Sequence, residues 1–162
     1  MANKTLYILY NADASVMGKL RYGYKKLTAK PDCEPTCAAC DITHGGLSLK
    51  ESPEWVVAKK EIESGSDLKV IQLHRDEMSA KVSARRVEAG ERSSLTVVQL
   101  KSFVEGNGMK YPAVVLDQGN EGFREVMNSS DLAACNGKPD QFVQALKGKV
   151  IWGSEFQAQA SL

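Results

Sequence analysis

The stretch Tyr111-Pro-Ala-Val-Val-Leu116 places a proline directly before a run of small and branched apolar residues. Such a run is typical of a buried strand, and proline is tolerated at the first position of a strand. Residues 117–122 follow with two glycines and an asparagine, which indicate a turn. Residues 123–127 supply a second strand. We therefore predict a β-hairpin over residues 112–127.

Two further strands are predicted upstream of this hairpin. Thr5-Leu-Tyr-Ile-Leu-Tyr10 is rich in β-branched and aromatic residues, and Leu68-Lys-Val-Ile-Gln-Leu73 is also typical of a strand. A helical crossover between two such strands is right-handed and makes them parallel. The hairpin pairs its strands antiparallel, so the sequence predicts a mixed four-stranded sheet within an α/β fold.

Five helices are predicted from apolar periodicity and capping residues. Asp13 is the expected N-cap of the first, whose apolar stripe is Val16, Leu20, Tyr24 and Leu27. Ser52-Pro53-Glu54 opens the second, and Thr96-Val-Val-Gln99 forms a capping box for the fourth. The predicted ranges are 13–27, 53–65, 78–90, 96–104 and 139–147, and residues 28–51 are predicted to form a loop.

This order of elements resembles the thioredoxin-like fold, in which a βαβ unit is followed by a helix and a ββα unit. That fold places a cis-proline at the start of its third strand, where this chain has Tyr111-Pro112. The resemblance covers residues 5–147 and implies a three-layer sandwich, with a Cys-containing loop and an extra helix inserted after the first helix. We assign residues 1–148 to one domain and 149–162 to a C-terminal tail anchored by Trp152.

The cysteine pair departs from the redox members of that fold. They carry Cys-x-x-Cys at a helix start directly after the first strand, where this chain has Asn11-Ala-Asp-Ala-Ser15. Here Cys37-Ala-Ala-Cys40 lies within the predicted loop, and the next predicted helix begins only at residue 53. The sequence thus offers no reason to place Cys37 at a helix N-terminus, the position that lowers a thiol pKa.

Three chemistries fit the segment 33–44, which holds three thiols and an imidazole. Zinc binds sulfur and nitrogen ligands. Its candidate ligands are Cys33, Cys37, Cys40 and His44, or else Cys37, Cys40 and His44 with a remote His74 or Cys135. Thiol–disulfide chemistry would use Cys37 and Cys40, with Cys33 or Cys135 resolving. The spacing Cys-x3-Cys-x2-Cys also resembles the radical-SAM cluster motif, but the chain is short for that barrel. The remaining alternative is that the cysteines are incidental.

A second set of polar residues follows the parallel strands, at the edge where ligands collect in open α/β sheets. We predict Asp13 and His74 as catalytic residues beside Cys37 and Cys40, because His exchanges protons near neutral pH. The predicted substrate contacts are Asn11, Arg75, Tyr111 and Pro112. The cysteine loop is expected to return to this edge and to bring His44 near His74. The alternative is a solvated rim on which Arg75 pairs with a neighbouring carboxylate.

Composition narrows the function classes. Lys and Arg number 21 against 20 Asp and Glu, and a net charge of +1 gives no general attraction to nucleic acid or anionic membranes. The start of the chain resembles no secretory signal, so a cytoplasmic location with reduced thiols is expected. Hydrolase and phosphate-binding motifs are absent from the sequence. We expect thiol-redox or zinc chemistry toward a small molecule or protein thiol; the alternative is a non-catalytic binding module.

Overall fold

The computed structural model describes residues 4–11, 27–28, 37–45, 48, 50–78, 94–150 and 152. At its centre is a sheet of strand order β2-β1-β3-β4, formed by β1 (Lys4–Leu9), β2 (Leu68–Leu73), β3 (Ala113–Asp117) and β4 (Phe123–Met127). β1 and β2 are parallel, β3 runs antiparallel to β1, and β4 runs antiparallel to β3. The predicted mixed sheet and hairpin are confirmed, and this order is compatible with a thioredoxin-like topology.

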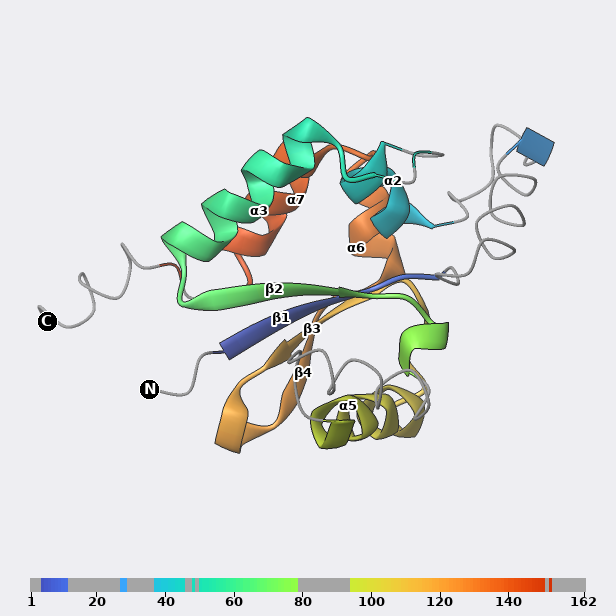
Figure 1. Cartoon of the computed structure of the whole chain (residues 1–162), viewed down its shortest axis with the longest axis vertical. Coiled ribbons are helices and arrows are strands. Elements are labelled where there is room, and N and C mark those ends of the chain that lie inside the picture. Colours follow the sequence, from blue (N-terminus) through green and yellow to red (C-terminus); the bar gives the residue numbers. More distant parts are fainter. Residues whose placement is uncertain are drawn as a thin grey trace, which may run out of the picture.

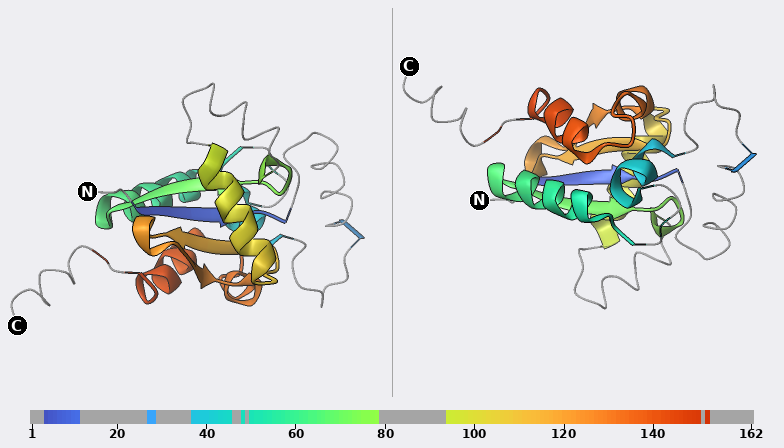
Figure 2. Two further views of the ribbon diagram at one scale, coloured as in Figure 1. Left: turned by 90° about the horizontal axis from the view of Figure 1, so that it is seen from below. Right: turned by 90° about the horizontal axis from the view of Figure 1, so that it is seen from above.

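Helices cover both faces of the sheet (Figure 1). α5 (Ser94–Gly106) crosses one face by itself, as the view from below in Figure 2 shows. The opposite face carries α2 (Ala38–His44), α3 (Pro53–Gly65), α6 (Ser129–Ala134) and α7 (Pro139–Lys147). Two short 3-10 turns, η1 (Asp76–Met78) and η2 (Gly119–Glu121), complete the described elements.

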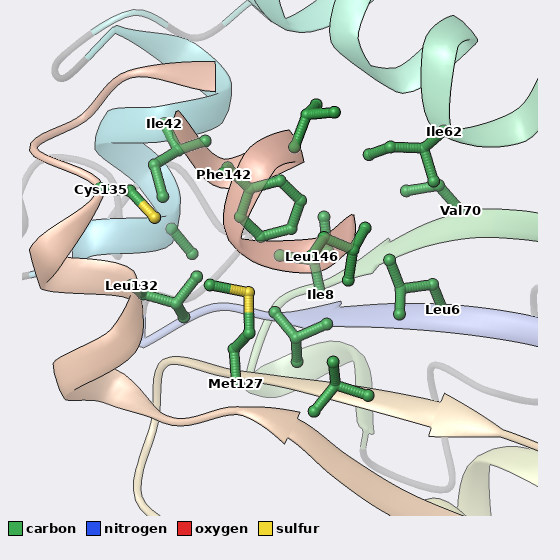
Figure 3. Packing of buried hydrophobic residues seen from close by; sticks show 14 of the residues in the cluster. Leu6, Ile8, Ile42, Ile62, Val70, Met127, Leu132, Cys135, Phe142 and Leu146 are labelled. Atoms are coloured by element: carbon green, nitrogen blue, oxygen red, sulfur yellow. The ribbon is translucent and has the colours of Figure 1, made fainter. Parts of the chain in front are cut away.

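Successive side chains of β1 point to opposite faces of the sheet, and the core is accordingly divided into two clusters. Leu6, Ile8 and Tyr10 face the side covered by α2, α3, α6 and α7, and they are completely or almost completely buried there. Tyr7 and Leu9 face α5 in the smaller cluster. Figure 3 shows the larger cluster, in which Leu6 and Ile8 of β1 pack with side chains from the helices above. β1 is thus a central strand buried on both faces.

Local signals placed α3 and α7 correctly. Ser52 Oγ accepts a hydrogen bond from the Trp55 backbone N–H at 3.1 Å, and Pro53 occupies the first turn of α3. Pro139 likewise opens α7. The predicted start of α5 is wrong by two residues, because the helix begins at Ser94 and Thr96 lies inside it.

Helix α6 was not predicted, although a capping box opens it. Asn128 Oδ1 accepts from the Asp131 N–H at 2.9 Å, and the Asp131 carboxylate accepts from the Asn128 N–H at 3.1 Å. The helix has only six residues, too few to show an apolar period.

Several predictions lie outside the described residues: most of the helix over 13–27 with Asp13, the thiol of Cys33, the helix over 78–90 and most of the tail. Leu27, the last member of the predicted apolar stripe, is described and is 77% exposed, whereas the other three members lie outside the described residues. Trp152 packs against the larger core cluster, as expected of an anchor. In the part of the chain that the structure describes, no helix has the length and apolar character to cross a membrane.

Candidate functional site

A disulfide bond joins Cys37 and Cys40 at the start of α2, with their Cα atoms 5.3 Å apart. Cys37 is the N-cap of the helix, and its Sγ accepts a hydrogen bond from the Cys40 backbone N–H at 3.3 Å. The loop predicted over 28–51 is therefore wrong within 38–44, and Cys37 does stand at a helix start. The seven residues of α2 were missed because so short a helix is stabilised by packing and shows no period of its own.

The disulfide lies at the edge of the larger core cluster. Cys37 is completely buried and Cys40 is 8% exposed, so Cys40 is the less buried of the two. Ile42, one turn further along α2, is also buried in this cluster. The turn between α6 and α7 lies against the same helix: Gly137 has a φ of +69°, and a Cβ there would stand 3.4 Å from Asp41 Cβ. α2 is thus held closely by its neighbours.

The other end of α2 meets the ends of the parallel strands at Tyr10. The Tyr10 hydroxyl donates to Thr43 Oγ1 at 2.8 Å and also contacts Gln72 Oε1. The His44 ring packs edge-on against the Tyr10 ring, with centroids 5.9 Å apart, and the His74 ring lies 4.7 Å from the same ring. The predicted return of the cysteine segment to this edge, with His44 near His74, is confirmed.

His74 has a carboxylate partner that orients its ring. Glu77 Oε2 lies 3.0 Å from His74 Nδ1 and accepts from the His74 backbone N–H at 2.8 Å. A carboxylate only accepts, so this pairing places a proton on Nδ1. The side chains are 22% and 14% exposed. In the neutral ring Nε2 then keeps its lone pair, which is the arrangement of a general base.

Burial changes the acidity of Tyr10. Its completely buried phenol has a pKa raised far above the ordinary value, mainly by desolvation and further by the carboxylates of Glu51 and Glu77, while the Thr43 hydrogen bond lowers it. Tyr10 therefore remains protonated and serves as a fixed hydrogen-bond donor. Sequence reasoning missed Tyr10 and Thr43, and it considered Glu77 only as a possible ion-pair partner of Arg75. Tyr10 could have been found because it shares the strand face of Leu6 and Ile8.

The predicted substrate contacts lie at the same end of the sheet. The Tyr111–Pro112 peptide bond is cis, and β3 starts directly after it, where Ala113 pairs with Leu9. The Tyr111 hydroxyl donates to Met78 Sδ at 3.5 Å, and burial raises the pKa of this tyrosine. Tyr111 packs with the core on the α5 face, whereas Tyr10 faces α2. Asn11 and Arg75 are exposed. Their role toward substrate remains a prediction.

Metal binding gains no support from the described side chains. Among them, no three His, Cys, Asp or Glu residues form a group that could hold an ion. Cys37 and Cys40 are bonded to each other, whereas zinc requires thiolates. Cys33 lies outside the described residues. A zinc site would need the reduced cysteines, and the ligand set Cys33, Cys37, Cys40 and His44 stays a prediction.

Cys135 is the free thiol of the described part of the chain. It is 3% exposed, its Sγ donates to the Asp131 carbonyl at 3.4 Å, and it belongs to the same cluster as Ile42 of α2 (Figure 3). Burial, followed by the nearby Asp131 carboxylate, raises the pKa of this thiol. Such a thiol is a poor nucleophile as it stands.

No protein-family model matches the chain, and no similar curated protein or solved structure is found. What defines this molecule is an α/β fold with a mixed four-stranded sheet and a Cys-x-x-Cys disulfide at a helix start.

Proposed function

We propose that this chain is a thiol–disulfide redox protein of thioredoxin-like topology, in which Cys37 and Cys40 cycle between disulfide and dithiol. The observation that carries the proposal is the disulfide at the first turn of α2, a helix that packs on the ends of β1 and β2 through Tyr10. The cis peptide bond before Pro112 lies at this same end of the sheet, which agrees with the resemblance.

The exposures of the two cysteines favour one order of steps. A thiolate of a partner dithiol attacks Cys40 Sγ, because Cys40 is the less buried member, and a mixed disulfide forms. Cys37 leaves as a thiolate, which the Cys40 N–H stabilises by the hydrogen bond it already donates. The second partner thiol then attacks the partner's own sulfur and releases Cys40. The partner is oxidised to its disulfide, and two electrons and two protons pass to the cysteine pair.

A second candidate is a binding module whose disulfide is structural, and the complete burial of Cys37 favours it. A reversible redox titration distinguishes the redox protein from the binding module. It is performed on the Cys33→Ser, Cys135→Ser variant, so that the Cys37–Cys40 pair is the only one that can be oxidised and reduced. A redox-active pair should titrate as one two-electron transition between about −270 and −120 mV. A midpoint below about −300 mV would assign a structural disulfide.

The order of attack is tested by trapping. In the same background, Cys37→Ser should accumulate a mixed disulfide with a small aromatic disulfide reagent faster than Cys40→Ser does. Faster labelling of Cys37 would reverse the order proposed. Metal content of the reduced wild-type chain tests the zinc alternative in parallel, since about one zinc per chain, released on chelation, would assign a metal site instead.

A further inference from the structure

A groove of about 570 Å³ runs between α2, α3 and the start of α7. Its inner wall is apolar, because Ile42 and Ala58 are buried there. Val57 of α3, also on the groove, remains 67% exposed. Exposed apolar side chains beside a concave surface are typical of a contact site for another molecule. The volume falls within the ~300–1,000 Å³ of common ligand sites.

Carboxylates dominate the charge of this groove among the described residues. Four of them line it, Asp41, Glu54, Glu61 and Asp140, against one described cationic side chain, that of Lys138. Lys147, which does not line the groove, forms a salt bridge with Glu61, and its Nζ lies 2.8 Å from Glu61 Oε1. Glu54 and Asp140, from the first turns of α3 and α7, are exposed. A basic ligand with apolar side chains therefore matches the groove in charge and in polarity.

The groove is continuous with the disulfide-bearing helix. Asp41 and Ile42 line it, and they directly follow Cys40 in α2. Cys40 is not among the lining residues, but the end of the groove formed by Asp41 and Ile42 lies within about one helical turn, ~5 Å along α2, of it. A docked segment would hold its own thiol near Cys40 and would raise the local concentration of the attacking group.

We infer that this groove docks a lysine- or arginine-containing, partly apolar segment of the protein thiol partner that exchanges with Cys40. This inference rests on the proposed redox function and adds the chemical class of its substrate. The exposed carboxylates of the groove, those of Glu54 and Asp140, would attract basic partners toward Cys40 and disfavour acidic partners.

Two short dithiol peptides test the inference. Both carry the same two cysteines and a leucine, and they differ only in having two flanking lysines or two flanking glutamates. The rate at which each reduces the oxidised Cys33→Ser, Cys135→Ser protein is measured by quenching with an alkylating reagent and intact-mass analysis. We expect the lysine peptide to react about tenfold faster at low salt, and added salt should shrink this difference.

Variants locate the effect. Glu54→Gln and Asp140→Asn should each slow the lysine peptide by roughly threefold, the size of an exposed ion pair, and should leave reduction by dithiothreitol unchanged. Glu125→Gln is the matched control, because Glu125 is an exposed carboxylate on β4 and not part of the groove. Equal rates for the two peptides, or an equal effect of Glu125→Gln, would overturn the inference.

A binding measurement separates this inference from the redox proposal. A cysteine-free, fluorescently labelled lysine peptide is titrated with the oxidised protein, and its anisotropy is followed. Binding that weakens in Glu54→Gln, together with a disulfide that no dithiol reduces, would keep the docking groove and refute the redox function. Rapid reduction by dithiothreitol with no binding of the lysine peptide would keep the redox function and refute the groove.

Discussion

The Tyr10 hydroxyl donates a hydrogen bond to the Thr43 hydroxyl at 2.8 Å, and this contact joins the end of β1 to the helix that begins at the disulfide. Thr43 Oγ1 in turn donates to the carbonyl of Ala39, which lies between the two bonded cysteines, at 2.9 Å. A buried chain of hydrogen bonds therefore runs from the sheet to the turn that holds the sulfurs. The placement of that turn depends on a tyrosine far from it in sequence.

Removal of this hydroxyl should destabilise the fold. Tyr10→Phe keeps the buried ring and loses the hydrogen bond to Thr43, so we expect the free energy of unfolding in urea to fall by about 1–2 kcal/mol. Tyr111→Phe is the matched control, because its hydroxyl is half-buried and, among the described residues, donates to a thioether, a weak acceptor. We expect the control to lose less than about 0.5 kcal/mol. Similar losses in both variants would contradict the role of the Tyr10–Thr43 contact.

The raised pKa of Tyr10 predicts a loss of stability at alkaline pH. Above pH 10 the unfolded chain releases the Tyr10 proton, whereas the folded chain keeps it, because burial raises the folded pKa. The contribution that this pKa difference makes to the free energy of unfolding is complete below pH 10. Above pH 10 it declines by about 1.4 kcal/mol per pH unit. We therefore expect the difference in free energy of unfolding between wild type and Tyr10→Phe, measured with denaturant, to be smaller at pH 11 than at pH 8. A constant difference between them would refute this assignment.

The sheet could be predicted because its signals are local. The run before Leu116, the glycine-containing turn and the continuous apolar strand over 5–10 each need only a few neighbouring residues. The return of the cysteine segment to the strand ends followed from the same reasoning, since the helix at 53–65 has to end where β2 begins.

The failures occur where tertiary contacts decide the structure. α2 and α6 are short, and each gains its stability from packing on other helices, which no window of sequence displays. The short spacing of Cys37 and Cys40 predicted that these two residues act together. The hydrogen bond between Tyr10 and Thr43 could not be predicted in this way, because it spans a sequence separation of 33 residues. Pairings of this length depend on the finished fold.

The free thiol of Cys135 should be protected in the native protein. It is 3% exposed and burial raises its pKa, so both access and thiolate fraction are low. In a Cys33→Ser background with the disulfide intact, we expect Cys135 to react with iodoacetamide at pH 8 at least about 100-fold more slowly than in urea. Mass spectrometry of the alkylated chain measures both rates. Native labelling as fast as unfolded labelling would show that Cys135 is not buried in the larger core cluster as described.

The close approach of Gly65 and Trp152 predicts a steric effect that a second substitution reverses. A Cβ at Gly65 would lie 2.6 Å from Trp152 Nε1 and 3.0 Å from its Cζ2, so the indole must move away from the end of α3. Lys147 Nζ lies over the same indole ring, 5.1 Å from its centroid, in a cation–π contact. We expect Gly65→Ala to lower the free energy of unfolding by about 1–2 kcal/mol.

In a Trp152→Ala background the clash is gone, and Gly65→Ala should become neutral or stabilising by up to ~1 kcal/mol, the usual gain of alanine over glycine in a helix. Gly106→Ala is the control, since a Cβ there has no atom within 4 Å, and it should behave alike in both backgrounds. Urea unfolding of the four variants of this double-mutant cycle gives the coupling energy directly. Strict additivity of Gly65→Ala and Trp152→Ala would mean that the indole does not rest on α3 in solution.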